Sequence, residues 1–246
     1  MKGVILAGGL GTRLYPCTSV VNKHLLPIYD KPMVYYPIET LVKAGCKDLL
    51  IVTGDSLGDF AQLIGNGKQF GLNSVLYAYQ ENPTGGIADA LKLAKSFVGH
   101  EKFVVVLGDN LILDDISSYI QEFEAEPEGG CKLFIKEIEN PTAFGVAEIT
   151  NGRITNLIEK PQHPPTNYAV IGVYMYDHRV FDLINSVRPS KRGELEITDV
   201  NMAYVAQGQA TYAILNSIWL DMGGFKSMFE ANRYMARLHG VQDVNL

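Results

Sequence analysis

The chain alternates between short apolar runs and longer stretches in which apolar residues recur at helical spacing. The apolar runs predict buried strands at residues 4–7, 48–53, 74–79 and 103–107. The intervening stretches predict helices at residues 34–44, 59–63 and 87–97, the first of them ended by Gly45. Strands that alternate with helices build βαβ units, so residues 1–110 predict a Rossmann-like, doubly wound α/β core with a mostly parallel sheet.

The later part of the chain has a more mixed pattern. Further strands are predicted at residues 132–138, 145–149, 154–159 and 168–176, and a helix at residues 225–240. No internal repeat or low-complexity tract interrupts the chain. We therefore expect a single α/β domain over residues 1–246, in which helices flank a mixed, mostly parallel sheet.

Composition and charge argue against several classes of function. Charged residues make up 20% and hydrophobic residues 47% of the 246 residues, as in ordinary globular proteins. The net charge of −6 argues against binding of a nucleic acid polymer, and no apolar run could span a membrane. Cys17, Cys46 and Cys131 are scattered, which predicts buried, reduced thiols rather than disulfides or a zinc site. We expect a cytoplasmic protein without a signal peptide.

The first predicted strand opens into a loop that contains Gly8, Gly9 and Gly11. Such a loop can present successive backbone N–H groups to phosphate oxygens. It has neither the G-K-[ST] ending of a P-loop nor the third glycine of the dinucleotide fingerprint. Arg13 and Lys23 follow the glycines, and two cations beside a glycine loop indicate that it binds a triphosphate.

The runs GGLGTRLYP at residues 8–16 and KHLLPIYDKPM at residues 23–33 resemble the signature of the sugar nucleotidyltransferases. The similarity is greatest to their glucose-1-phosphate thymidylyltransferase branch and continues along nearly the whole chain. It implies the nucleotide-diphospho-sugar transferase fold, with a nucleotide-binding core at residues 1–110, a sugar-binding part at 111–225 and a C-terminal helix at 226–246.

The resemblance also implies a reaction. A thymidylyl group passes from dTTP to α-D-glucose 1-phosphate, giving dTDP-glucose and pyrophosphate, with Mg²⁺ as cofactor. It places the enzyme in carbohydrate biosynthesis, on the route to dTDP-rhamnose, and suggests a homo-oligomer. Because a phosphate oxygen is already ionised near neutral pH, we expect catalysis by positioning and charge stabilisation, without a general base.

Residue roles on the nucleotide side follow from the resemblance. Arg13 and Lys23 match the catalytic cations. Asp109, which ends a predicted strand, and Asp221 match the aspartates that bind Mg²⁺, an ion that takes few carboxylates and fills its shell with phosphate and water oxygens. The positions that match nucleotide-binding residues are Leu6, Gly8, Gly9, Gly11, Thr12, Arg13, Gln80, Gly85, Gly86 and Asp109.

Residue roles on the sugar side follow in the same way. The Glu159-Lys160-Pro161 triplet matches a motif whose lysine holds the sugar phosphate and whose glutamate binds sugar hydroxyls. The positions that match sugar-phosphate-binding residues are Asn110, Gly145, Glu159, Lys160, Val170 and Tyr174. The run GELEITD at residues 193–199 is also typical of the thymidylyltransferase branch. We interpret it partly as scaffold, and do not expect its three acidic residues to be catalytic.

The sequence departs from the commoner bacterial pattern at several positions. His24 stands where glutamine is usual, and Ile171 replaces a threonine beside the sugar-site glycine, which removes one possible contact to the sugar. Residues 84–87 hold one extra residue in the base-binding loop, and residues 222–224 read Met-Gly-Gly instead of Thr-Gly-Thr. The chain is a short form, and we expect weakened feedback by a nucleotide sugar because longer members build a regulatory site from C-terminal helices.

Three alternatives remain at this point. The first is a sibling enzyme that uses UTP or another sugar 1-phosphate. The second is a nucleotide-sugar sensor without catalysis, although both cations and both aspartates are present. The third is a Rossmann-type dehydrogenase, which the missing third glycine disfavours.

Overall fold

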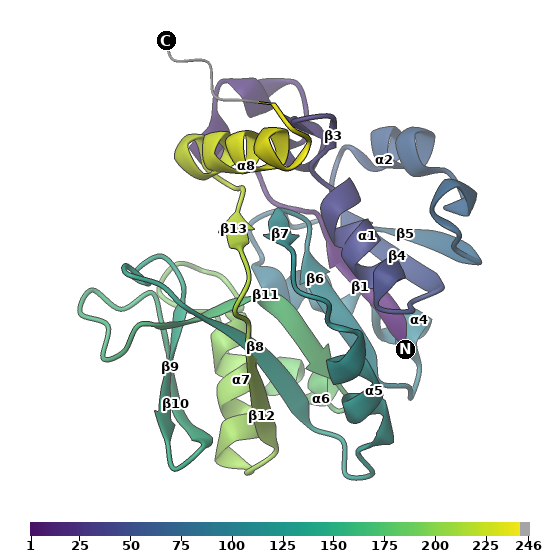
Figure 1. The fold of residues 1–246 in the computed structure, drawn as a ribbon. Coiled ribbons are helices and arrows are strands. Elements are labelled where there is room, and N and C mark those ends of the chain that lie inside the picture. Colours follow the sequence, from purple (N-terminus) through teal and green to yellow (C-terminus); the bar gives the residue numbers. More distant parts are fainter. Residues whose placement is uncertain (242–246) are drawn as a thin grey trace.

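A computed structural model describes residues 1–241 and is built around one nine-stranded sheet (Figure 1). The main strand order is β10-β9-β11-β6-β1-β4-β5, and β8 pairs with β11 and β12. The strands of this sheet are β1 (Lys2–Leu6), β4 (Asp48–Thr53), β5 (Ser74–Tyr79), β6 (Phe103–Leu107), β8 (Cys131–Glu137), β9 (Gly145–Thr150), β10 (Arg153–Glu159), β11 (Tyr168–Tyr176) and β12 (Ala210–Ile214).

The sheet is mixed, as predicted, because its two parts pair differently. β6, β1, β4 and β5 run parallel to one another, with Ile5 paired to both Ile51 and Val106. β11 pairs antiparallel with β6, β8 and β9, and β12 returns parallel to β8. The parallel part holds the predicted doubly wound core. The carboxyl ends of its strands form one edge of the sheet, where α/β proteins place their ligands.

Helices cover both faces of this sheet, as the continuous burial along β1, β4 and β6 requires. The helices are α1 (Tyr35–Lys43), α2 (Leu57–Ile64), α3 (Ile87–Lys92), α4 (Lys95–Val98), α5 (Ser117–Ala125), α6 (Val180–Ser186), α7 (Ile197–Ala206) and α8 (Phe225–Leu238). In β1, Val4 and Leu6 pack in a core cluster with α3, α4, α6 and α7. Ile5 and Ala7 face the other side and pack in a cluster with α1, α2 and α5.

Two small sheets complete the described structure. β2 (Pro27–Ile28) pairs with β3 (Lys31–Pro32), and β7 (Asn110–Ile112) pairs antiparallel with β13 (Trp219–Asp221). Figure 1 shows β13 leading from the body of the sheet to α8 and lying beside β7. Short 3₁₀ helices occur at η1 (Thr12–Leu14), η2 (Cys17–Ser19), η3 (Lys23–Leu25) and η4 (Lys68–Phe70).

Two predictions about local structure were wrong. The helix expected at residues 87–97 is divided into α3 and α4, because Leu93 and Ala94 donate to carbonyls three residues back, at Ala90 and Leu91, which tightens the chain into a turn. Cys17 is exposed rather than buried, since it lies in the surface loop after the glycines; Cys46 and Cys131 are buried, and all three thiols are free.

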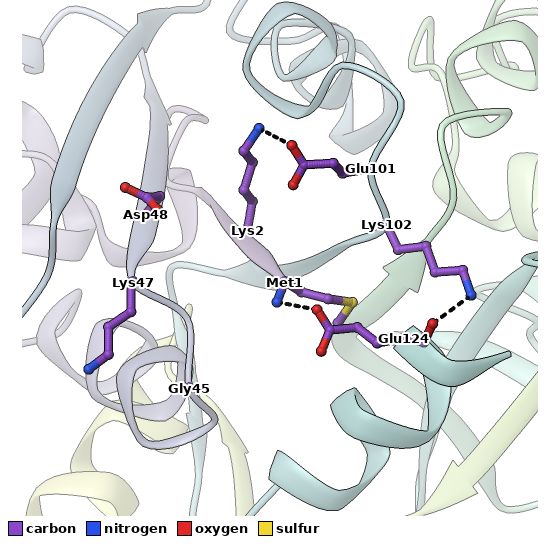
Figure 2. Close-up of a pocket in the computed structure, with 8 residues that line it drawn as sticks. All are labelled: Met1, Lys2, Gly45, Lys47, Asp48, Glu101, Lys102 and Glu124. Atoms are coloured by element: carbon purple, nitrogen blue, oxygen red, sulfur yellow. Dashed lines mark hydrogen bonds and ion pairs between the residues drawn. The ribbon is translucent and has the colours of Figure 1, made fainter.

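An open cavity of about 550 Å³ lies at the amino ends of the parallel strands (Figure 2). It is lined by residues that precede or begin strands, such as Lys2, Asp48 and Lys102. The Met1 ammonium pairs with Glu124 at 2.5 Å, and Lys2 pairs with Glu101 at 2.7 Å. Since the glycine loop follows the carboxyl end of β1, this cavity lies at the opposite edge of the sheet from the predicted site.

None of the helices in residues 1–241 combines the length and the apolar character that crossing a membrane requires.

Candidate active site

The glycine loop leaves β1 as a tight turn that only glycine accommodates easily. Gly9 and Gly11 have φ angles of 90° and 63°, in the left-handed region. The carbonyl of Gly11 accepts hydrogen bonds from Leu14 N and Thr18 Oγ1, both at 2.9 Å, and this begins η1. A Cβ on Gly11 would lie 2.9 Å from Cγ2 of Thr18. The loop is therefore fixed on one side and open on the other.

Two cations and two carboxylates meet beside this loop. Lys23 Nζ lies 2.5 Å from Asp109 Oδ2, and both Arg13 Nη atoms lie 3.3 Å from Asp221 Oδ2. A Cβ built on Gly223 would lie 2.4 Å from Arg13 Nη2, 2.9 Å from Asp221 Oδ1 and 3.0 Å from Asp109 Oδ2. The guanidinium and both carboxylates thus converge on one point, which a side chain at position 223 would obstruct.

Strand pairing brings the two aspartates together. Asp109 directly follows β6, and β7 continues from it at Asn110. Asp221 ends β13 and is the register partner of Asn110 across the β7–β13 pair. Backbone geometry therefore places Asp221 beside Asp109, although 111 residues separate them along the chain.

The two carboxyl groups have different electrostatic surroundings. Burial alone would raise the pKa of Asp109, but the charges of Lys23, His24 and Arg13 and a hydrogen bond from Lys23 lower this pKa below its usual range. Burial raises the pKa of Asp221, and the neighbouring Asp109 carboxylate raises it further. A divalent cation between them would favour the ionised form of both carboxyl groups.

The donor set fits Mg²⁺. Asp109 and Asp221 offer hard carboxylate oxygens, and Mg²⁺ usually takes one or two protein carboxylates and completes its shell with phosphate oxygens and water. Across residues 1–241 there is no cluster of three or more His, Cys, Asp or Glu side chains suited to an all-protein metal cage. A two-carboxylate site is therefore suited to a cation that arrives with a phosphate substrate.

His24 lies behind the charged centre and is almost fully buried. Its Nδ1 is 2.8 Å from Asn22 Oδ1, and a Cβ on Gly108 would lie only 2.7 Å from its Cδ2. Burial, followed by the charge of Lys23, lowers the pKa of His24 to about 3. The imidazole is thus neutral near pH 7 and adds no third cation to the site.

A second loop, residues 80–86, lies near the first. A Cβ on Gly8 would lie 2.4 Å from Gln80 Oε1, so Gln80 covers the start of the glycine loop. Gly86 has a φ of 89°, and a Cβ there would lie 2.6 Å from the carbonyl oxygen of Leu195. Leu195 N also donates to the carbonyl of Gly85 at 2.9 Å. Segment 193–199 therefore contacts this loop, which agrees with its interpretation partly as scaffold.

The Glu159 carboxylate organises a third group of residues. Its Oε2 accepts from Thr198 Oγ1 at 2.5 Å, while its Oε1 lies 3.2 Å from Lys160 Nζ and 3.3 Å from Arg192 Nη2. A Cβ on Gly145 would lie 2.9 Å from Thr198 Oγ1 and 3.6 Å from Glu159 Oε2. The glycine is needed here because the hydroxyl and the carboxylate fill the space beside it.

One known protein family has a sequence model that fits this chain. The family model described as nucleotidyl transferase matches residues 2–237. The chain belongs to the nucleotidyl transferase family.

Three relatives of this nucleotidyl transferase are named glucose-1-phosphate thymidylyltransferase, and a fourth is named UDP-glucose pyrophosphorylase. Glucose-1-phosphate thymidylyltransferases from Neisseria meningitidis and Xanthomonas campestris pv. campestris are 40% and 42% identical over the whole chain, which covers 86% and 84% of their lengths. A crystal structure from Bacillus anthracis, described as a glucose-1-phosphate thymidylyltransferase, superposes with a TM-score of 0.90 at 43% identity, covering 100% of this chain and 97% of that one. A UDP-glucose pyrophosphorylase complexed with UDP-glucose has a TM-score of 0.81 at 26% identity, with 96% and 98% covered.

The fold of this transferase brings most of the predicted site residues into three groups. Around the charged centre lie Arg13, Lys23, Asp109 and Asp221. The glycine loop and Gln80 adjoin it, and Gly145, Glu159, Lys160 and Val170 lie together around the Glu159 carboxylate. Tyr174 is buried, and burial followed by the charges of Glu159 and Asp109 raises its pKa.

Some residues of the transferase site were not predicted. Arg192 and Thr198 both contact Glu159, although Arg192 was given no role and residues 193–199 were interpreted partly as scaffold. Trp219 contacts Asn110, a residue whose amide is engaged inside the protein. Proximity to recognised motifs was the available signal, since Trp219 is two residues from Asp221 and Arg192 directly precedes the GELEITD run.

Proposed function

We propose that this nucleotidyl transferase transfers a thymidylyl group from dTTP to α-D-glucose 1-phosphate, releasing pyrophosphate and forming dTDP-glucose with the help of Mg²⁺. The observation that carries the proposal is the convergence of Arg13, Lys23, Asp109 and Asp221 beside an open glycine loop. The names of relatives at 40% and 42% identity support the choice of substrates.

The residues present can perform the transfer by holding charges in place. An oxygen of the sugar phosphate attacks the α-phosphorus, and pyrophosphate leaves with the electron pair of the broken P–O bond. Lys160 neutralises the attacking phosphate so that two anions can approach. Arg13 and Lys23 stabilise the charge that develops on the reacting and leaving phosphates. Mg²⁺ held by Asp109 and Asp221 would supply Lewis-acid charge neutralisation at the phosphates.

The ion pairs of the charged centre can exchange partners when the substrate binds. Lys23 pairs with Asp109 and Arg13 pairs with Asp221, so each positive charge already lies beside a negative one. When a polyanion enters together with its cation, the carboxylates can turn to the cation and the two basic side chains to the phosphates. The charge therefore stays balanced, which keeps the desolvation cost of binding low despite the net charge of −6.

Ile171, which replaces a threonine of the commoner pattern, lies in the core of the protein. It has no exposed surface and packs in the core cluster with Val173 and Met175. The replacement of a threonine at this position therefore changes the core rather than the group around Glu159. The names of the relatives support glucose 1-phosphate as the acceptor.

The proposal predicts a defined order of nucleotides. The Gly85 N–H already donates to the carbonyl of Asn82 at 3.1 Å, which leaves the Gly86 N–H of this loop for the base. It would suit the O4 acceptor of thymine or uracil and would oppose the amino group of cytosine, at a cost of roughly 1–3 kcal/mol. Thymine and uracil differ by one methyl group, so UTP should follow dTTP within roughly 10–200-fold in kcat/KM. We expect dCTP far behind, and purine triphosphates excluded by size.

The test is pyrophosphate release with glucose 1-phosphate held fixed and each triphosphate varied. A higher kcat/KM for UTP than for dTTP would assign the chain to a uridylyl sibling. No pyrophosphate release with any pair of substrates would favour a nucleotide-sugar sensor. Light scattering coupled to size exclusion tests the separate prediction of a homo-oligomer.

A further inference from the structure

The chain passes from β12 of the nine-stranded sheet to β13 through residues 215–218, which we call the crossing segment (Figure 1). At its start, Leu215 N donates to the carbonyl of Ile135 on β8 at 2.9 Å. At its end, the carbonyl of Ile218 accepts from Leu113 N at 3.3 Å. Backbone bonds to the two sheets thus hold the ends of the crossing segment, and side chains hold its middle.

Lys136 holds the crossing segment from the side of β8. Its Nζ donates to the carbonyl oxygens of Leu215, Asn216 and Ser217 at 3.1, 2.9 and 2.8 Å. A lysine ammonium has three N–H donors, so three consecutive carbonyls occupy all of them. Hydrogen bonds from a charged donor are also stronger than those between neutral groups. One side chain therefore fixes three carbonyl oxygens in a row.

Asp114 holds the same segment from the side of β7. Its Oδ1 and Oδ2 lie 3.3 and 3.1 Å from Ser217 N, which donates to them. An open cavity of about 460 Å³ is lined by Ser217 together with Tyr234 of α8. Because α8 leaves this space beside the crossing segment, the segment depends on its hydrogen bonds more than on close packing.

The β7–β13 ladder that follows is short, with three residues on each strand. It pairs Asp221 with Asn110, and this register brings the Asp221 carboxylate beside Asp109. A shift of a strand by one residue turns every side chain to the opposite face. Such a shift would turn the Asp221 carboxylate away from Asp109. An anchor at the start of β13 therefore determines where Asp221 lies.

We propose that Lys136 and Asp114 are positioning residues of the transfer reaction, which fix the crossing segment and through it the place of the Asp221 carboxylate. The proposal rests on the proposed function for the role of Asp221 in holding Mg²⁺. Neither side chain touches substrate or metal in this scheme. Because the two anchors hold the segment from different sheets, loss of either one should loosen β13 and leave the nine-stranded sheet folded.

Four substitutions test the two anchors. Lys136→Met removes the ammonium and keeps a side chain of similar length. Asp114→Ala removes both acceptor oxygens, whereas Asp114→Asn keeps one acceptor for Ser217 N and is the conservative variant. Lys132→Met is the matched control, because Lys132 also lies on β8 and its Nζ pairs with Glu122 at 3.0 Å.

Hydrogen exchange followed by mass spectrometry tests the anchors without metal or substrate. In Lys136→Met and Asp114→Ala, the amides of residues 219–222 should exchange about tenfold faster than in the wild type, since each variant loses hydrogen bonds that involve a charged group. The amides of β6 should exchange at the wild-type rate. Asp114→Asn and Lys132→Met should match the wild type in both regions.

Metal binding tests the consequence for the site. The Mg²⁺ concentration for half-maximal turnover should rise about tenfold in Lys136→Met and Asp114→Ala, as when an outer support of a metal ligand is lost. Binding of Mn²⁺ with dTTP, followed by electron paramagnetic resonance in the absence of glucose 1-phosphate, should weaken by a similar factor. KM for glucose 1-phosphate should stay near the wild-type value, because other contacts hold Glu159 and Lys160.

The outcomes separate the possible failures. Wild-type exchange of residues 219–222 in Lys136→Met would overturn the proposal. Faster exchange with unchanged Mn²⁺ binding would also overturn it, because the anchors would then hold the strand without positioning Asp221. An equal loss of Tm in Lys136→Met and Lys132→Met, with no change in Mn²⁺ binding, would show that Lys136 only stabilises the fold. Failure of the proposed function would appear separately, as absence of pyrophosphate release from the wild-type enzyme with dTTP and glucose 1-phosphate.

Discussion

His24 should make the free energy of unfolding depend on pH even between about pH 5 and 6.5, above the pKa of an ordinary carboxylate. Burial, followed by the nearby charge of Lys23, lowers the pKa of this imidazole from 6.5 to about 3 in the folded protein. In the unfolded chain the pKa returns to about 6.5. Between these two values the unfolded chain binds a proton that the folded protein does not. Acidification through this range therefore favours unfolding, and the loss is absent above pH 6.5.

The size of the effect follows from the two pKa values. Each pH unit below the unfolded pKa costs about 1.4 kcal/mol until the folded pKa is reached. A decrease from pH 7 to pH 5 covers about 1.5 such units, so His24 alone should lower the free energy of unfolding by about 2 kcal/mol. At pH 5 the folded protein still carries a neutral imidazole, because this pH lies well above its pKa of about 3.

Urea unfolding at pH 7 and pH 5 without added Mg²⁺ measures this contribution. His24→Gln, which places an uncharged amide at this position, should lose about 2 kcal/mol less than the wild type between the two pH values. His163→Gln replaces an exposed histidine and should behave as the wild type does. If His24→Gln loses as much stability between pH 7 and pH 5 as the wild type, the reasoning from burial is refuted.

Three further predictions concern single side chains. Lys23→Ala should lower kcat by roughly 10²–10³ in a pyrophosphate-release assay. An unchanged kcat would show that Lys23 does not stabilise the reacting phosphates. Asp221→Asn should sharply raise the Mg²⁺ requirement with Tm maintained, and full activity at low Mg²⁺ would contradict the metal assignment. Gly86→Ala should lower the unfolding free energy by roughly 1–3 kcal/mol, more than Gly71→Ala, whose added Cβ meets nothing within 4 Å; equal losses would contradict the close contact with Leu195.

The parallel half of the fold could be predicted because each strand there is a continuous apolar run. β1, β4, β5 and β6 lie at or within two residues of their predicted bounds. α5, α6 and β12 were also not predicted, and several of the missed elements carry weak local patterns. β7 and β13 have three residues each, and α7 is apolar on most of its surface, so neither strand nor helical periodicity stands out. Their conformations depend on partners that are distant in the sequence.

The same reason explains what was missed in the site. Arg13, Lys23, Asp109 and Asp221 could be named because each lies in a recognisable motif. Thr198 could not, since its contact with Glu159 spans 39 residues and depends on how α7 packs against β10. The Asn110 amide was assigned to the sugar phosphate, but three of its hydrogen-bonding contacts are to Asp109, Gly172 and Trp219. A sequence pattern identifies the residue type and leaves its partners undefined.

The pairing of β13 with β7 has a consequence for synthesis of the chain. The parallel core up to β6 emerges from the ribosome well before β13, and amino-terminal parts of a protein generally fold first. A nascent chain that has reached β7 holds Asp109 and Lys23 but lacks Asp221, Trp219 and the cover of α8. Under the proposed function such a chain lacks one of the two carboxylates that would hold Mg²⁺. Turnover would then require that residue 221 has been synthesised and that β13 has paired with β7.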